Sequence, residues 1–139
     1  MKAVFICYLQ NTMSEIRNSF QVEPHILGAC ASDRSIILYD IRLATPMRKV
    51  IMEMNTNAIA WNPMEAPTFI AANEDYNLYA FDMRHLKRPT NVHMDHVSAV
   101  TCVGFAPTGR EFVSGSYDKT VRIFPGLFRV YNICQADLC

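Results

Sequence analysis

Apolar residues recur along the chain in short runs that are broken by single acidic residues. Three segments share this pattern: 27–42, 69–84 and 112–124. In each, small and apolar residues lead to an aspartate, and β-branched or aromatic residues alternate with other residues after it. Alternation of this kind, with turn residues at its ends, is typical of β-strands. Each segment therefore predicts a strand, a tight turn and a second strand.

The aspartates at the three predicted turns are evenly spaced. Asp75 lies 42 residues after Asp33, and Asp118 lies 43 residues after Asp75. Asp suits a tight turn because its carboxylate accepts hydrogen bonds from nearby backbone amides. A repeat of about 40–45 residues is typical of one blade of a β-propeller. The spacing therefore predicts three repeats of one structural unit.

An aromatic residue precedes each of these turns at a matching distance. Phe20, Trp61 and Phe105 lie 13, 14 and 13 residues before the three aspartates. We expect each aromatic residue to end the innermost strand of its unit. Alternating stretches at 49–54 and 90–94 are predicted as fourth, outer strands. Helix signals are almost absent, so the pattern predicts an all-β fold.

The composition is that of a chain with a packed core. It has 139 residues, half of them apolar, which is enough to bury a core. Thirteen basic and thirteen acidic residues give a formal net charge of zero. A dominant nucleic-acid-binding surface is therefore not expected. No apolar run approaches the roughly 18 residues of a membrane-spanning helix, so no membrane contact is predicted.

The cysteines predict neither a disulfide framework nor a zinc site. Five is an odd number, and no two of them are close in sequence, whereas both kinds of site use closely spaced pairs. A reducing compartment is the better interpretation. We expect Cys30 and Cys102 to be buried as small apolar residues.

The third unit carries a specific motif. Its residues at characteristic spacings are His96, Val100, Phe105, Pro107, Gly109, Ser114–Ser116, Asp118, Val121 and Ile123–Phe124. In these positions the chain resembles the WD-repeat β-propeller family, and the resemblance extends over about residues 20–124. It implies about three four-stranded antiparallel blades, at about 20–54, 55–95 and 96–124. The segments 1–19 and 125–139 fit no blade and are expected to be an atypical N-terminal segment and an atypical tail.

Three blades would make an incomplete propeller, because a closed ring needs about four to eight. The outer faces of both end sheets would then lack a neighbouring blade. We expect both faces to expose apolar surface, which favours aggregation.

The resemblance also implies a hydrogen-bonded brace within a blade. In the family, this brace joins a histidine, a serine or threonine, the turn aspartate and a tryptophan. Here His96, Ser114 or Ser116, and Asp118 match three members. Phe124 stands where the tryptophan is usual, so the indole donor would be absent. For Asp33 and Asp75 we expect the role of ordinary turn residues.

A second resemblance lies at the ends of the first two units. Residues 27–42 and 69–84 resemble the sixteen-residue box of WD-repeat substrate receptors of cullin-RING ubiquitin ligases. In that family the final arginine contacts the ligase adaptor, which implies an adaptor-binding role for Asp40 with Arg42 and for Asp82 with Arg84. A guanidinium group suits this role because it binds carboxylates or carbonyls through two hydrogen bonds. The alternative is a pair of solvated surface ion pairs, each worth about 0–1 kcal/mol.

Residues 44–47, 61–79 and 93–100 narrow the resemblance to the WD-repeat and SOF-domain family. That resemblance implies a nuclear, nucleolar protein of the small-subunit processome, which acts in pre-18S ribosomal RNA maturation and is also described as a cullin-4 ligase receptor. The family has a full ring of blades and a SOF segment, so we expect this chain to be partial. The first interpretation is a non-enzymatic scaffold for processome proteins. The alternative is a ubiquitin-ligase substrate receptor that binds the cullin-4 adaptor.

Basic residues gather after the third strands of the first two units. They are Arg42, Arg48, Lys49, Arg84, Lys87 and Arg88, and a propeller would place them on one rim. Such a patch would suit pre-ribosomal RNA phosphates or an acidic protein surface. Because the chain has no net charge, it is an equal alternative that these basic residues form only a solvated surface.

Catalytic, cofactor and metal sites find little support. No glycine-rich phosphate loop and no nucleophile elbow is present. His93 and His96 with Asp95 would offer ligands to a metal, but they do not lie on a helix that would bring them to one face. His96 is better explained as a blade histidine. We therefore predict no enzyme activity, no cofactor and no metal.

Overall fold

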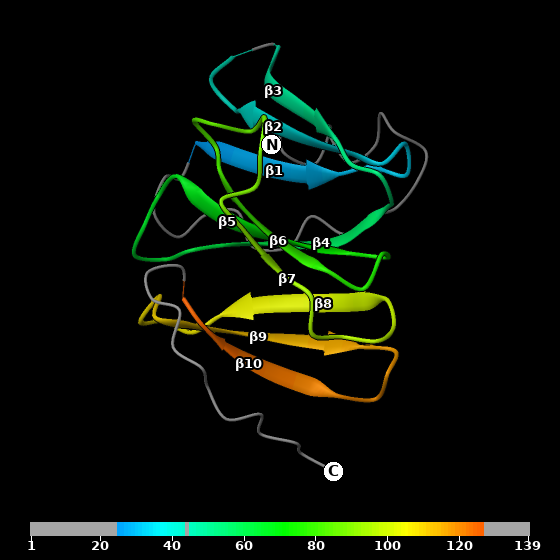
Figure 1. Cartoon of the computed structure of the whole chain (residues 1–139). Coiled ribbons are helices and arrows are strands. Elements are labelled where there is room, and N and C mark those ends of the chain that lie inside the picture. Colours follow the sequence, from blue (N-terminus) through cyan, green and yellow to red (C-terminus); the bar gives the residue numbers. More distant parts are fainter. Residues whose placement is uncertain (1–24, 44, 127–139) are drawn as a thin grey trace.

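The computed structural model describes residues 25–43 and 45–126, which form ten β-strands and no helix (Figure 1). The strands are β1 (Ile26–Cys30), β2 (Ser35–Asp40), β3 (Pro46–Ile51), β4 (Thr56–Trp61), β5 (Thr68–Asn73), β6 (Leu78–Asp82), β7 (Asn91–His93), β8 (Val100–Phe105), β9 (Glu111–Ser116) and β10 (Val121–Pro125). They make three antiparallel sheets, ordered β1-β2-β3, β4-β5-β6-β7 and β10-β9-β8. The predicted all-β fold of three antiparallel sheets is confirmed and is consistent with a partial WD propeller, although among the described residues only the second sheet has the expected four strands.

The three sheets stack on one another in chain order (Figure 1). The strands β4 and β8 lie side by side, and Asn57 donates from Nδ2 to the carbonyl of Val100 at 2.8 Å. Trp61 ends β4 and Phe105 ends β8, as predicted, whereas Phe20 lies outside the described residues. The predicted limits of the three blades remain predictions.

The outer strands are found close to where they are predicted. β7 covers 91–93 within the predicted 90–94, but β3 covers 46–51 instead of 49–54. β3 begins early because Pro46 pairs with Tyr39 beyond a bulge at Met47, where β3 has one residue more than β2. It ends at Ile51 because the next amide, of Met52, donates to the carbonyl of Arg34 in the hairpin turn at 2.8 Å.

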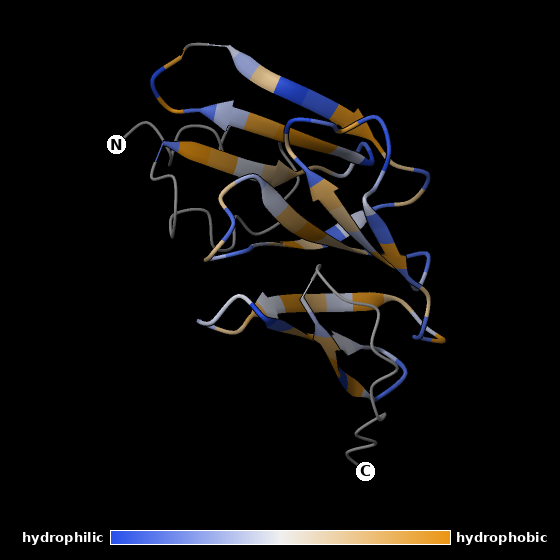
Figure 2. Cartoon of the chain, turned by 60° about the vertical axis from the view of Figure 1, so that its left-hand side comes forward, coloured by the Kyte–Doolittle hydropathy of each residue, from blue (hydrophilic) through white to orange (hydrophobic). Residues whose placement is uncertain are grey.

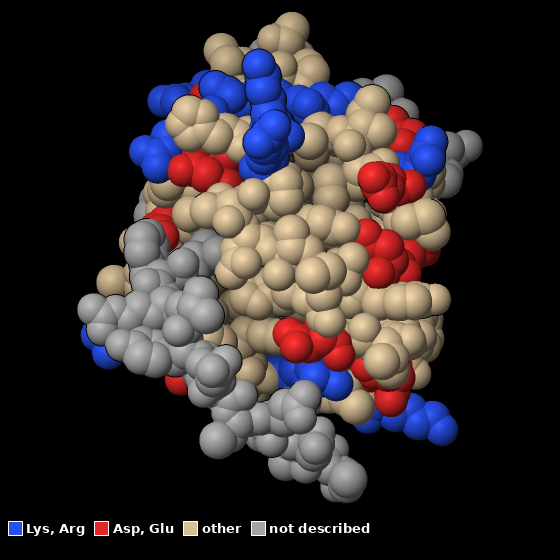
Figure 3. Space-filling model, viewed as in Figure 1, with Lys and Arg blue, Asp and Glu red and all other residues tan. Residues whose placement is uncertain are grey.

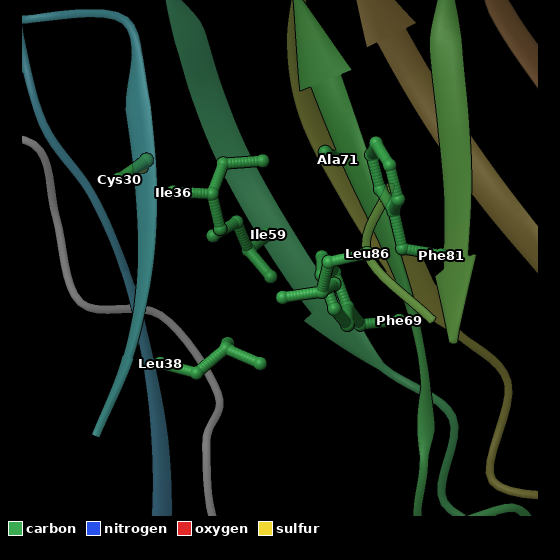
Figure 4. Packing of buried hydrophobic residues seen from close by; sticks show 8 residues of the cluster. All are labelled: Cys30, Ile36, Leu38, Ile59, Phe69, Ala71, Phe81 and Leu86. Atoms are coloured by element: carbon green, nitrogen blue, oxygen red, sulfur yellow. The ribbon is translucent and has the colours of Figure 1, made fainter. Parts of the chain in front are cut away.

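The first two sheets pack through an apolar cluster (Figure 4). Ile36 and Leu38 of β2 point toward the second sheet, where Ile59, Phe69 and Phe81 face them. The rings of Phe69 and Phe81 stack with centroids 5.6 Å apart. Burial of each large side chain contributes about 1.5–3 kcal/mol, which explains why the sheets stay together. Figure 2 shows hydrophobic residues along many of the strands and hydrophilic residues in many connections, while the outer strand β3 also carries hydrophilic residues.

β5 is buried on both faces because it lies in the middle of the stack. Phe69 and Ala71 face the first sheet, while Ile70 and Ala72 join the cluster against the third sheet. This second cluster comprises Ala58, Ile70, Ala72, Leu78, Ala80, Val100, Phe112 and Phe124. The rings of Phe112 and Phe124 stack with centroids 5.0 Å apart. A strand covered on both sides needs an unbroken apolar run, which is what residues 69–72 provide.

The three hairpin turns have the same geometry. In each, the aspartate accepts a hydrogen bond from the amide two residues later, at 3.1, 3.2 and 2.8 Å in chain order. The residue between them has a positive φ: 63° at Arg34, 73° at Tyr76 and 65° at Lys119. The predicted role of Asp in these turns agrees with this geometry. Three bulky residues thus occupy a left-handed conformation that favours glycine.

The outer face of the third sheet has no neighbour among the described residues. Val113, Val121 and Ile123 are 41–51% exposed on this face. Cys102 also lies exposed here, so the prediction that it is buried is wrong, whereas Cys30 is buried as predicted. The pairing register shifts between Val100 and Cys102, and Cys102 then faces away from the second cluster. The expected second open face is not seen, because β1 and β2 are largely buried on both faces.

Candidate functional site

The first arginine box is a compact turn at the end of β2. Asp40 is the last residue of the strand and is buried, while Arg42 is exposed. The amide of Arg42 donates to Asp40 Oδ1 at 2.9 Å, and its guanidinium donates from Nε to Oδ1 at 3.1 Å and from Nη2 to Oδ2 at 3.0 Å. The amide of Leu43 closes the turn on the carbonyl of Asp40. One carboxylate therefore holds both the backbone and the side chain of the arginine.

The second box repeats this arrangement at the end of β6. The amide of Arg84 donates to Asp82 Oδ1 at 2.9 Å, and its guanidinium donates from Nε to Oδ1 at 3.0 Å and from Nη2 to Oδ2 at 2.7 Å. The amide of His85 closes the turn on the carbonyl of Asp82. The two arginine side chains are 66% and 65% exposed. The two boxes thus share the same pattern of hydrogen bonds and expose nearly the same fraction of the arginine side chain.

The paired charges in each box stabilise one another. The side-chain hydrogen bond from Arg42, together with its backbone amide, holds the pKa of Asp40 below its usual value, against the opposing effect of burial. The pKa of Asp82 is lowered in the same way by Arg84, and the pKa of Arg84 is raised by Asp82. Both carboxylates are therefore ionised at neutral pH, and both arginines keep their forked geometry.

The boxes lie on neighbouring sheets and are linked. Arg48 of β3 donates from Nη1 to the carbonyl of Arg84 at 2.9 Å, so the first sheet reaches the second box. Arg48, Lys87 and Arg88 are exposed on this side, and Figure 3 shows Lys and Arg gathered over the upper part of the molecule. We call the ends of β2 and β6, with these three basic residues, the box rim.

Lys49 does not join the box rim. Its Nζ lies 3.0 Å from Asp33 Oδ2, in the hairpin turn at the other end of β2. Lys49 also lowers the pKa of Asp33 to about 2, after a stronger side-chain hydrogen bond from Ser35. Lys49 therefore lies away from the other five residues of the predicted basic patch.

A buried brace joins the third turn to the connection before β8. His96 Nδ1 lies 2.8 Å from Asp118 Oδ2, and His96 Nε2 lies 2.7 Å from Ser114 Oγ. An ionised carboxylate can only accept a hydrogen bond, so we assign the ring proton of His96 to Nδ1. Nε2 then accepts a hydrogen bond from the Ser114 hydroxyl. Burial alone would raise the pKa of Asp118, but bonds from Thr120, His96 and backbone amides outweigh it and lower the pKa strongly.

The structure separates the two serines between which the sequence could not choose. Ser114 contacts the histidine, whereas Ser116 donates to the carbonyls of Ser98 and Ala99 at 2.9 Å. Thr120, which sequence reasoning missed, donates to Asp118 Oδ1. The sequence contains a signal for this residue, because a hydroxyl or amide side chain follows each turn aspartate by two residues. These side chains are Ser35, Asn77 and Thr120.

The other predicted residues hold their own turns. Asp33 accepts from the amide and the hydroxyl of Ser35, and Asp75 accepts from the amide of Asn77 and from the Tyr79 hydroxyl at 2.6 Å. Phe124 packs on Phe112 instead of donating a hydrogen bond. The turns and the brace thus lie at the opposite end of the strands from the box rim.

Two further findings concern ligands and membranes. Within the described ranges, no three His, Cys, Asp or Glu side chains are grouped so that they could hold a metal ion. Within the same ranges, no helix is long and apolar enough to cross a membrane.

The chain resembles known proteins over most of its length. Residues 87–124 match the family described as WD domain, G-beta repeat. Over 104 residues, 75% of the chain, it is 64% identical to DDB1- and CUL4-associated factor 13 of Danio rerio and 66% identical to that of Homo sapiens. It is 57% identical to Protein SOF1 of Saccharomyces cerevisiae over the same share. The matched part is only 23%, 23% and 21% of these relatives.

Proposed function

The chain is a WD-repeat protein related in sequence to DDB1- and CUL4-associated factor 13 and to Protein SOF1, and from this premise we propose that it is a non-enzymatic interaction scaffold. We propose that its box rim docks DDB1, the adaptor in the relatives' name, and that it serves as a substrate receptor of a CUL4 ubiquitin ligase. The observation that supports this is the pair of equivalent arginine boxes on neighbouring sheets.

The geometry of the boxes suits docking. An arginine held by its own aspartate loses little side-chain freedom on binding, which lowers the entropic cost of an interface. About two thirds of each arginine side chain is exposed to a partner. Arginine is also enriched among the residues that contribute most to protein interfaces. Arg42 and Arg84 are therefore the residues that we expect to carry adaptor binding.

Co-purification tests this proposal. We expect the Arg42→Ala/Arg84→Ala variant of the full chain to recover at least about ten-fold less DDB1 than the parent, since each hot-spot arginine is worth about 2 kcal/mol or more. The matched control is Lys87→Ala/Arg88→Ala, which removes two positive charges from the same rim and should retain binding. Equal loss in both variants would show that general charge, not the boxes, attracts the adaptor.

We also propose a pre-ribosomal role, because the box rim carries exposed Arg48, Lys87 and Arg88. Three basic side chains beside two neutralised boxes suit phosphates of pre-ribosomal RNA or acidic proteins of the small-subunit processome. This role would place the protein in the nucleus and the nucleolus and assign it to pre-18S processing. Sedimentation with pre-ribosomes tests it. The Lys87→Ala/Arg88→Ala variant should lose association, and the arginine-box variant should retain it.

A further inference from the structure

Arg48 connects the sheet of the first arginine box to the second box. Its Nη1 donates to the carbonyl of Arg84 at 2.9 Å, although Arg48 lies on β3 of the first sheet and Arg84 follows β6 of the second. This carbonyl belongs to the turn in which Asp82 holds the guanidinium of Arg84. Hydrogen bonds from an ionised donor are among the stronger ones in proteins. The second box is therefore held both by its own aspartate and by a side chain from the neighbouring sheet.

A bulge in β3 directs Arg48 toward the second sheet. Met47 is the extra residue where the register with β2 shifts, and the next residue, Arg48, pairs with Leu38. Paired residues of an antiparallel sheet point to the same face, and Leu38 points toward the second sheet (Figure 4). Without the extra residue, a strand that began at the same place would set Arg48 opposite Ile37, on the other face. Redirecting a side chain in this way is a common role of β-bulges.

The second sheet, which lies wholly within the described residues, has neither the bulge nor an arginine at the corresponding place. β6 and β7 pair without a register shift, and Asn91 lies opposite Ala80, two residues before the box aspartate, as Arg48 does in the first sheet. Asn91 has a short side chain, and its Oδ1 accepts from the amide of Val92 at 2.9 Å. The link is therefore a particular feature of Arg48 and the second box, and it does not follow from the repeat.

The peptide group between Arg84 and His85 is held on both sides. Its carbonyl accepts from Arg48, and its amide, that of His85, donates to the carbonyl of Asp82 at 2.9 Å. Two hydrogen bonds to one peptide group polarise and strengthen each other. The orientation of this peptide fixes the backbone from which the Arg84 guanidinium projects. Because Arg84 pairs with Asp82 at 2.7 Å, the approaching guanidinium of Arg48 meets a neutralised group.

We propose that Arg48 is a positioning residue that fixes the second box relative to the first, so that Arg42 and Arg84 meet the adaptor as one preorganised unit. This proposal rests on the proposed function, because it concerns how the same box rim binds DDB1. Two contacts held on one rigid surface bind with less loss of freedom than two contacts that move independently. Arg48 acts through the turn of Arg84, and its own contact with the adaptor is not required.

Amide hydrogen exchange of the full chain, resolved by NMR, tests the positioning without any adaptor. The variant Arg48→Met keeps a long side chain but has no hydrogen-bond donor. We expect the amides of Arg84 and His85 to exchange about three- to ten-fold faster in it than in the parent, because the turn loses one of its bonds. The matching amides of Arg42 and Leu43 in the first box are the internal control and should be unchanged. Arg48→Lys, which keeps the charge and a donor, should restore most of the protection.

A double-mutant cycle of DDB1 affinity tests the consequence for binding. Arg48→Met should weaken binding about three- to ten-fold in the parent and in the Arg42→Ala background. In the Arg84→Ala background it should have no further effect, because the residue that Arg48 positions is gone. The matched control is Arg88→Met, which removes another positive charge from the box rim and should keep the affinity of the parent.

Two results would overturn the positioning role. One is unchanged exchange at the amides of Arg84 and His85 in the Arg48→Met variant. The other is an equal loss of affinity in the Arg84→Ala background, which would show that Arg48 contacts the adaptor directly. Failure of the proposed function gives a different result, because Arg42→Ala/Arg84→Ala would then bind DDB1 like the parent. The coupling of the boxes for adaptor binding would fall with it, and the exchange experiment would still decide whether Arg48 orders the second box.

Discussion

The buried histidine of the third sheet shows how single residues fix this fold. Both ring nitrogens of His96 have partners, and each partner belongs to a different part of the third hairpin. His96 thereby connects the segment before β8 to β9 and to the turn after it. The sequence could identify this residue through a family pattern, but it could not decide which serine it contacts. Both serines point to the same face of β9, because they lie two residues apart, so the choice depends on which of them His96 reaches, and the sequence does not fix that position.

Removal of one brace hydroxyl tests this connection. We expect Ser114→Ala to lower the free energy of unfolding by about 1–3 kcal/mol, because it leaves His96 Nε2 buried without a partner. Urea denaturation measures the change. The control is Thr108→Ala in an exposed turn, which should change the free energy by less than about 0.5 kcal/mol. Equal values for the two variants would contradict a structural role for the brace.

The turn aspartates make stability depend on pH. The pKa of Asp33 is lowered from 3.8 to about 2, so the folded state prefers its ionised form. This contribution is fully present above about pH 4 and is lost as the pH falls toward 2, because protonation then favours the unfolded chain.

The variant Asp33→Asn isolates this effect, since an amide oxygen can still accept the bond from the Ser35 amide. Unfolding in urea at pH 5, 4, 3 and 2 should show a smaller loss of stability for the variant than for the parent. Parallel curves would exclude Asp33 as a source of the acid sensitivity.

At the scale of elements, the repeat explains both what was predictable and what was not. Strand alternation and evenly spaced aspartates predict the strands, the turns and their order, because these depend on the local pattern. Exposure depends instead on what packs against each face. Val113 and Ile123 hold the positions that Ile70 and Ala80 hold one sheet earlier, where the third sheet buries them. The same pattern is therefore buried in one sheet and exposed in the next. Cys102 is exposed for the same reason.

The open face of the third sheet should promote association. Val113 and Ile123 lie directly opposite each other, so Val113→Lys/Ile123→Glu would place an ion pair on this face. Size-exclusion chromatography with light scattering should then show less self-association than in the parent, with an unchanged melting temperature.

A matched pair on the other face of the same strands serves as the control. Phe112 and Phe124 also lie opposite each other but are buried, so Phe112→Lys/Phe124→Glu should abolish cooperative melting. If the outer-face variant also fails to melt cooperatively, the face is covered in solution and the interpretation is wrong.

The whole molecule has two distinct ends. The box rim carries two matched arginines and three further basic residues, and the opposite end carries the hairpin turns, where acidic residues lie beside the basic residues Arg34, Lys49 and Lys119. The resemblance to the sixteen-residue box predicts that both arginines lie at strand ends. It could not show that each guanidinium is bonded to the aspartate two residues earlier. It also could not show that Lys49 turns away toward Asp33, since a side chain of that length reaches either end of a strand.

Hydrogen–deuterium exchange of the full chain with and without DDB1 tests most directly which end docks the adaptor. We predict slower exchange at residues 40–43 and 82–88, with unchanged exchange at residues 74–77 and 117–120. Protection confined to these hairpin turns, or no protection at either box, would contradict the proposal that Arg42 and Arg84 bind the adaptor.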